Sequence, residues 1–266
     1  MSLRFAKAHG LGNDFLLVEA RLAPKDTAAW ARRLCDRHTG IGADGVLLYE
    51  ARGRDRIGMR LVNADGSDAE ISGNGLRCVA AWGVRQGLLD ARHRVETAAG
   101  PRAVSVAPAG GARYRIETDL GLPQQAGPLD EPLQVLERIL HVTATSMGNP
   151  HCAVFVDTPP GDAVLFSLGP ALEHHPRFPN RTNVEFVAVE SRSAIRVRFW
   201  ERGAGYTRSS GTGSASAAAA AILHGRVDRK LAVHCEGGTL EVDWPEGGTL
   251  RQVGDVEILA EGDWLA

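Results

Sequence analysis

The sequence predicts an α+β fold of two pseudo-symmetric domains, each a curled, mostly antiparallel sheet around a central helix. Three observations predict it. A Ser-Gly-X-Gly turn followed by a helix of small residues occurs twice, within 63–87 and within 201–225. Strand-like runs precede the two turns at matching distances. The 266 residues, 44% of them hydrophobic, suffice for one large core or two ordinary ones.

The first half consists of short apolar runs separated by glycine turns, a pattern typical of strands. Asp26 is expected to cap a helix that continues to about Arg37, because Trp30 and Leu34 lie on one face at helical spacing. A second helix is expected to follow Ser72 and to end near Gly87. The expected strands are Leu3–Lys7, Phe15–Val18, Val46–Tyr49, Ile57–Val62, Arg94–Thr97, Ala103–Val106 and Tyr114–Thr118.

A repeated spacing indicates that the second half duplicates the first. Asn149 lies 61 residues before Ser210, and Asn13 lies 59 residues before Ser72. The starts of two strands, at 45 and 183, each lie 27 residues before their serine. Agreement to within two residues favours a duplicated half.

The domain boundary is expected in a glycine- and proline-rich segment at 121–132. We expect one domain at 1–118, joined by a C-terminal strand at about 250–266, and the other at 119–249. The last strand, Val253–Leu259, is expected to pack on the first half. The other expected elements of the second half are the strands Cys152–Val156 and Val184–Val189, a helix after Ser210 and a hairpin at Leu231–Trp244.

Charge and composition narrow the class of protein. A formal net charge of −2 with dispersed charges gives no basic stripe, so neither nucleic acid nor a membrane is an expected partner. No apolar run approaches the roughly 18 residues of a membrane span, and residues 1–10 lack the core of a secretory signal. A cytoplasmic location is expected. Buried free thiols, and no metal site, are predicted for Cys35, Cys78, Cys152 and Cys235.

The two serine-glycine turns have the chemistry of anion sites. The first N–H groups of a helix lack intrahelical partners and are partly positive, so they attract a carboxylate. Glycines let a small anion approach the backbone. The alternative for each turn is that the serine is only an N-cap, but pairing across a duplication favours a site. We expect a substrate carboxylate to lie between the domains, held by the backbone amides of Gly73, Asn74, Gly211 and Thr212.

Seven motifs follow one another along nearly the whole chain. They are HGLGNDF at 9–15, GIGADGVL at 40–47, MRLVNADGSDAE at 59–70, SGNGLRC at 72–78, MGNPHCAVFV at 147–156, TNVEFV at 182–187, and ERGAG with SSGTG at 201–213. Together they resemble the diaminopimelate epimerase family. The resemblance implies a pair of mirrored domains, no pyridoxal phosphate or other cofactor, no metal, a homodimer, and interconversion of LL- and meso-diaminopimelate in lysine and peptidoglycan precursor synthesis.

The chain departs from the family's pattern at its centre. Two cysteines occupy the family positions of Ser72 and Ser210, where this chain has serine. A cofactor-free epimerase needs one group to take the α-proton and another to return a proton to the opposite face. A thiol, with a pKa of roughly 8.5, suits this, whereas an alcohol is a far weaker acid. The sequence therefore predicts an inactive or slow epimerase.

Three explanations of the serines remain open. They are engineered into an ordinary epimerase; or they are natural, and His151 and Glu201 supply acid-base groups, for instance in a lyase, dehydratase or other racemase; or the protein is a binding pseudoenzyme. The resemblance places His151 and Glu201 beside the reactive positions, and histidine titrates near neutrality. The structural alternative for His151 is a buried, hydrogen-bonded strand residue.

The resemblance also supplies a recognition set for a small amino-acid substrate. Amides can read an amino group and a carboxylate, and an arginine can bind a distal carboxylate bidentately. The alternative for any one asparagine is a turn residue. Tyr206 stands where the family commonly has glutamate, which leaves the substrate open, as does Arg208 two residues before the second serine. The set comprises Asn13, Asn63, Asn149, Asn183 and Arg202, with Gly45 counted at the position that matches Asn183.

Overall fold

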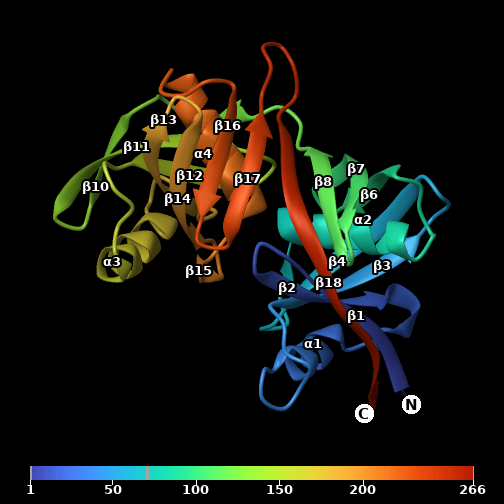
Figure 1. Ribbon diagram of the computed structural model, residues 1–266. Coiled ribbons are helices and arrows are strands. Elements are labelled where there is room, and N and C mark those ends of the chain that lie inside the picture. Colours follow the sequence, from blue (N-terminus) through green and yellow to red (C-terminus); the bar gives the residue numbers. More distant parts are fainter. Residues whose placement is uncertain (1, 70–71, 266) are drawn as a thin grey trace. The chain divides into compact units, whose positions relative to one another are not determined.

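The computed structural model describes residues 2–69 and 72–265, and the chain divides into two compact units. Unit 1 is Met1–Asp119 with Val253–Ala266, and unit 2 is Leu120–Gln252. Figure 1 labels the elements of both. None of the helices within the described ranges is long and apolar enough to cross a membrane.

Unit 1 encloses one helix, α2, in a curved sheet. β2 and β3 are parallel, as are β4 and β6, and the pairs β1–β2, β3–β4, β6–β7 and β7–β8 are antiparallel. β18 pairs antiparallel with β1. The elements are β1 Ser2–Gly10, β2 Asn13–Glu19, η1 Ala20–Leu22, α1 Thr27–Cys35, β3 Gly45–Ala51, β4 Arg56–Asn63, β5 Asp68–Ala69, α2 Gly73–Arg85, β6 Arg92–Thr97, β7 Gly100–Gly110, β8 Arg113–Asp119 and β18 Arg251–Leu265.

Unit 2 repeats this order of pairings around α4. β12 and β13 are parallel, as are β14 and β16, and the pairs β11–β12, β13–β14 and β16–β17 are antiparallel. The predicted α+β fold, with a mostly antiparallel sheet around a helix in each half, is confirmed. The elements are β9 Gln124–Gln125, β10 Glu131–Val135, β11 Arg138–Ser146, β12 Pro150–Phe155, α3 Asp162–Glu173, β13 Asn183–Ser191, β14 Ala194–Glu201, β15 Gly205–Thr207, α4 Gly211–Leu223, β16 Lys230–Cys235 and β17 Gly238–Asp243.

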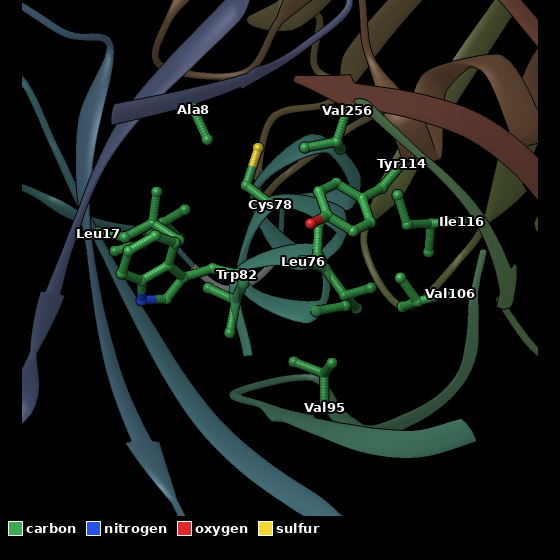
Figure 2. Packing of buried hydrophobic residues seen from close by; sticks show 14 of the residues in the cluster. Ala8, Leu17, Leu76, Cys78, Trp82, Val95, Val106, Tyr114, Ile116 and Val256 are labelled. Carbon is green, nitrogen blue, oxygen red and sulfur yellow. The ribbon is translucent and has the colours of Figure 1, made fainter. Parts of the chain in front are cut away.

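Both central helices are buried among the strands of their unit. Leu76 and Trp82 of α2 are buried among strand side chains such as Val95, Val106 and Ile116, as Figure 2 shows. In α4 the run from Ala217 to Ala221 has no exposed surface at all. A helix that is apolar all round is expected only where it is buried on every side. Because each central helix is buried within its unit, the position of its first turn is fixed relative to the surrounding strands.

The strands β2, β3, β12 and β13 have continuous buried runs, and alternate residues of these strands pack on different helices. In β2, Phe15 and Leu17 pack with α2, whereas Leu16 and Val18 pack with α1. In unit 2, Cys152 and Val154 of β12, with Val184 and Phe186 of β13, pack with α3. The intervening residues of β12 and β13, among them His151 and Glu185, consequently face α4.

The structure differs from several of the elements predicted from the sequence. α1 ends at Cys35, two residues before the expected end, because Asp36 already has non-helical backbone angles. α3 was not among the expected elements, and it contains Gly169 and Pro170. Gly169 is required there, because a Cβ would lie 2.7 Å from the Trp200 ring. β9 and the start of β10 fall within the segment predicted as a linker.

Candidate active site

The two serines begin the two enclosed helices. Ser72 Oγ accepts a hydrogen bond of 3.0 Å from the Gly75 N–H, and Ser210 Oγ accepts one of 3.1 Å from the Gly213 N–H. Both serines have extended backbone angles, φ −131° and −136°, as N-cap residues do. The capping interpretation is therefore correct for both. It is compatible with an anion site, because a cap uses one of the first N–H groups of the helix and leaves the turn positive.

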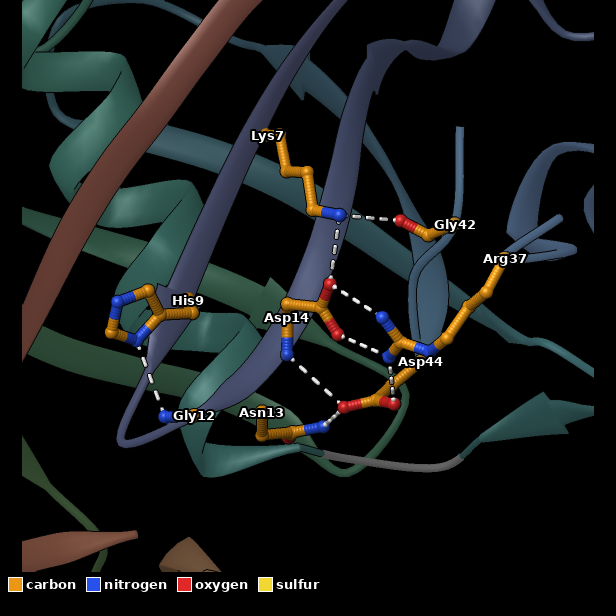
Figure 3. Close-up of polar contacts among 8 residues, drawn as sticks. All are labelled: Lys7, His9, Gly12, Asn13, Asp14, Arg37, Gly42 and Asp44. Carbon is orange, nitrogen blue, oxygen red and sulfur yellow. Dashed lines mark hydrogen bonds and ion pairs between the residues drawn. The ribbon is translucent and has the colours of Figure 1, made fainter. Parts of the chain in front are cut away.

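Next to the α2 turn, Asn13 is held by residues of two other elements. Its side-chain NH2 donates to Asp44 at 2.7 Å, and its carbonyl oxygen accepts from the Asn74 amide at 3.2 Å. Asp44 in turn accepts from Arg37 at 2.8 Å, and Figure 3 shows the contacts among Asn13, Asp44 and Arg37. The glycine turn before β2 thus presents Asn13 toward the start of α2.

The neighbouring Asp14 anchors the same network. Burial alone would raise the pKa of Asp14, but hydrogen bonds and charge from Arg37 and Lys7 outweigh burial and hold its pKa below the usual value. Arg37 lies 2.7 Å and Lys7 3.0 Å from the carboxylate oxygens. An ionised Asp14 fixes the strand that carries Asn13.

Asn63 and Gly45 lie side by side at the ends of β4 and β3. Asn63 donates through its side-chain NH2 to Ser67 Oγ at 3.0 Å, which makes it part of the turn that follows β4. A Cβ at Gly45 would lie 2.8 Å from Leu61 Cδ1 and 2.9 Å from the Val62 carbonyl oxygen. Packing is thus sufficient to require glycine at 45.

A chain of polar contacts lies next to the α4 turn. His151 Nδ1 lies 2.7 Å from Glu185 Oε1, and His151 Nε2 lies 3.0 Å from Asn149 Oδ1. The Asn149 amide donates to Thr212 Oγ1 at 3.4 Å, which links the chain to α4. His151 is 1% exposed, so it is the buried, hydrogen-bonded strand residue that the structural alternative described.

Glu185 shares this burial with His151. Burial raises the pKa of Glu185, while the charge of His151 and the hydrogen bond to it act in the opposite direction. Sequence reasoning missed Glu185. The available signal was a glutamate inside the apolar run Val184–Val189, at a position that alternation turns toward α4.

Arg202 and Asn183 are joined through the backbone. The Arg202 N–H donates to Asn183 Oδ1 at 3.0 Å, and the Asn183 amide donates to the Pro150 carbonyl at 2.8 Å. Glu201 ends β14 and opens the turn that carries Arg202. Buried Glu173 of α3 supports this turn by accepting from the Gly203 N–H at 2.9 Å, a role that the sequence analysis did not anticipate.

Within unit 1 the structure gathers Asn13 and Asn74 at the start of α2. Within unit 2 it gathers Asn149, His151 and Thr212 at the start of α4. Gly211 is also buried there, and its carbonyl accepts a hydrogen bond of 2.8 Å from the Gln252 side-chain amide. In the described part of the chain, no group of three or more histidine, cysteine, aspartate or glutamate side chains is arranged to hold a metal ion.

Comparison with known proteins decides the family. The model of the family described as diaminopimelate epimerase matches residues 5–125 and 143–259. The chain belongs to the diaminopimelate epimerase family. The diaminopimelate epimerase of Pelotomaculum thermopropionicum is 41% identical over 278 residues, covering 98% of this chain and 99% of that relative. Diaminopimelate epimerase 1 of a Nostoc species is 43% identical over 266 residues, covering 92% and 93%.

Solved structures show the same fold at low identity. A predicted epimerase from Pseudomonas aeruginosa matches with a TM-score of 0.75 and 15% identity, over 99% of both chains. A hydroxyproline epimerase from Agrobacterium vitis, with bound trans-4-hydroxy-L-proline, matches with a TM-score of 0.74 and 16% identity, over 98% of this chain and 92% of that one. The fold is therefore that of diaminopimelate epimerase and its isomerase neighbours.

Against the diaminopimelate epimerase family pattern, Tyr206 is an unusual residue whose surroundings are now clear. Its ring lies 6.0 Å from that of Phe166 of α3, and its hydroxyl donates to Glu236. Tyr206 thus packs with the α3 layer of unit 2, on the other side of the sheet from α4. This substitution has a local packing role. Nothing in the structure explains Arg208, whose carbonyl accepts from the Gly237 N–H.

Proposed function

We propose that this chain is a cofactor-independent epimerase of the diaminopimelate type, acting at the α-carbon of LL- and meso-diaminopimelate, with turnover impaired by Ser72 and Ser210. One observation carries the proposal. Two serines occupy identical N-cap positions on the enclosed helices of two units with the same topology. The family match gives that duplicated position its chemistry.

The reacting carboxylate is proposed to bind the N–H groups of both helix starts. Gly73, Asn74, Gly211 and Thr212 are the first residues of α2 and α4, where the backbone is partly positive. The capping side chains at 72 and 210 lie at these helix starts. Those side chains are then the groups best placed to exchange the α-proton.

The distal end of the substrate is proposed to be bound by the set of asparagine side chains and Arg202. Asn13, Asn63, Asn149 and Asn183 provide amides, and the Arg202 guanidinium provides a bidentate partner for the second carboxylate. The Arg202 backbone is fixed by Asn183, and its turn by Glu173, so its side chain starts from a rigid base. We propose that these residues recognise the distal end of the substrate. We also propose that the protein is a homodimer and is located in the cytoplasm, as the family suggests.

The hydroxyls limit the chemistry. Epimerisation needs a base on one face of the α-carbon and an acid on the other, with proton-transfer groups whose pKa values lie near the working pH. A thiol at a helix N-terminus meets that condition. A serine hydroxyl is too weak an acid, and the shifts of about 3 to 5 units seen for strongly perturbed buried groups do not bring it into range.

The test combines binding with restoration of the thiols. The melting temperature of the protein is measured with and without LL- and meso-diaminopimelate, and the double variant Ser72→Cys/Ser210→Cys is then assayed for epimerisation. Stabilisation by either isomer, with activity in the double variant, supports the proposal. Stabilisation without activity indicates a binding pseudoenzyme, and no stabilisation rejects diaminopimelate as the ligand.

A second function is favoured by the intact polar chain at α4. A lyase or dehydratase that removes a β-substituent needs a single base, and His151 with Asn149 and Glu185 forms an acid-base group that does not depend on a thiol. Glu201 is the second candidate group for this reaction. Release of a keto acid or an unsaturated product from an amino acid with a β-leaving group, by the unaltered protein, would support it. A His151→Gln variant is the control and is expected to abolish the release.

A further inference from the structure

The two units differ at one pair of matched positions. β2 pairs with β3 through Phe15 and Gly45, and β12 pairs with β13 through His151 and Asn183. His151 therefore matches Phe15. Two residues further along β3 and β13, Glu185 matches Leu47.

The first helical turns confirm this match. A Cβ at Gly75 would lie 3.0 Å from Leu47 Cδ2, and a Cβ at Gly213 would lie 3.1 Å from Glu185 Oε1. The latter Cβ would also lie 2.8 Å from Ser210 Oγ. One methyl group would thus touch both oxygens, so the carboxylate and the hydroxyl lie on the same side of the α4 turn. The α2 turn has leucine in that place.

The polar pair is not explained by stability. Phe15 and Leu47 show that two apolar side chains fill the same framework, and well-packed apolar residues often replace a buried ion pair without loss of stability. Glu185 Oε2 has no hydrogen-bond partner within residues 2–69 and 72–265, and an unsatisfied buried oxygen is unfavourable. A role in the site is the remaining reason for the pair.

We propose that Glu185 is a positioning residue: it holds the His151 ring against Asn149 and places a carboxylate beside the capping side chain at 210, where the matching position at the α2 turn has Leu47. This inference rests on the proposed function for its effect on turnover. The two half-sites are then chemically unequal. The group at 210 retains its proton more strongly than it would without the carboxylate.

The charged and titratable groups around Glu185 are few. His151 on β12 faces it directly, and the backbone of Cys152 donates to it. The ion pair of Glu131 and Arg177 acts on the Cys152 thiol next to it. The first turn of α4, Gly-Thr-Gly-Ser, contributes no charged side chain. The carboxylate is therefore a group that should oppose ionisation at 210.

The test uses single introduced thiols, since the four native cysteines are buried. Ser210→Cys and Ser72→Cys variants are alkylated with iodoacetamide from pH 6 to 10, each with and without Glu185→Gln, and modified sites are identified by mass spectrometry. Loss of the carboxylate should lower the pH midpoint of alkylation at 210 by about one unit, because a like charge opposes thiolate formation. The midpoint at 72 should not move. The unaltered protein reports on reaction at the native thiols.

A second variant transfers the apolar pair of unit 1 into unit 2. His151→Phe/Glu185→Leu should fold, since the sister unit accommodates these residues, and should lower the midpoint at 210 as Glu185→Gln does. A midpoint at 210 that stays or rises in both variants, or equal changes at 210 and 72, overturns the proposal.

Turnover gives an independent readout. In the Ser72→Cys/Ser210→Cys protein, Glu185→Gln should lower kcat and shift its pH profile while leaving KM unchanged. An unchanged kcat and pH profile would contradict the proposal. If the restored protein does not epimerise at all, the proposed function fails, and the alkylation comparison still decides the role of Glu185.

Discussion

Replacing Gly213 by alanine tests the geometry of the α4 turn directly. The new Cβ would lie 2.8 Å from Ser210 Oγ and 3.1 Å from Glu185 Oε1, closer than a Cβ normally approaches another atom. The serine cap or the carboxylate must therefore move. Loss of an N-cap lowers the free energy of unfolding by about 1 kcal/mol, and overpacking by about 1 to 3 kcal/mol. Alanine also lowers the conformational entropy of the unfolded chain, which raises the free energy of unfolding by about 0.4 to 1 kcal/mol.

The expected net loss for Gly213→Ala is about 2 kcal/mol, measured by urea denaturation followed by circular dichroism. Gly75→Ala is the matched control in unit 1. Its Cβ would meet the end of the flexible Leu47 side chain at 3.0 Å and Ser72 Cβ at 3.3 Å, so the expected loss is smaller. Equal stability of Gly213→Ala and the unaltered protein, or a larger loss for Gly75→Ala, would refute this description of the turn.

Three further predictions concern capping, pH and thiol reactivity. Ser72→Ala and Ser210→Ala should each lower the free energy of unfolding by about 1 kcal/mol in denaturation experiments, because each removes a cap; no change in either would contradict the hydrogen bonds assigned to it. Because burial raises the pKa of Glu185 in the folded state, its ionisation opposes folding as pH rises above the unfolded value near 4.5. The stability of Glu185→Gln relative to the unaltered protein, from urea midpoints, should therefore increase from pH 4 toward neutrality, and a decrease would show that the pKa is not raised. Iodoacetamide at pH 8 should modify none of Cys35, Cys78 and Cys152 before unfolding, as judged by mass spectrometry, because burial raises the thiol pKa values, to about 12 for Cys35 and Cys78 and well above the ordinary value for Cys152.

The duplicated turn could be predicted because its determinants are local. Serine, two glycines and a run of small residues specify an N-cap and a helix that tolerates close strands, and both caps are present as expected. The glycines that follow the two helices, Gly87 and Gly225, could be predicted in the same way. Their φ angles are +67° and +66°. Such conformations favour glycine whatever the surrounding fold.

Features that depend on tertiary packing could not be predicted from the sequence. α3 contains glycine and proline, yet it forms because Gly169 lets the helix approach Trp200. The partner of His151 could not be found from spacing, since Glu185 is 34 residues away and reaches it through strand register. Gly45 is predicted as a site position, and the packing of Leu61 and Val62 against it, which also requires glycine, was not predictable from the sequence.

The central claim is that the site is complete except for the two atoms that move the proton. The most direct measurement is α-proton loss from LL-diaminopimelate in deuterated water, followed by proton NMR, for the unaltered protein and for Ser72→Cys/Ser210→Cys. Restoring the two groups should accelerate exchange by at least about 100-fold, since a positioned acid or base contributes typically 10² to 10⁴-fold. Rapid exchange by the unaltered protein, or equally slow exchange by both proteins, would contradict the claim.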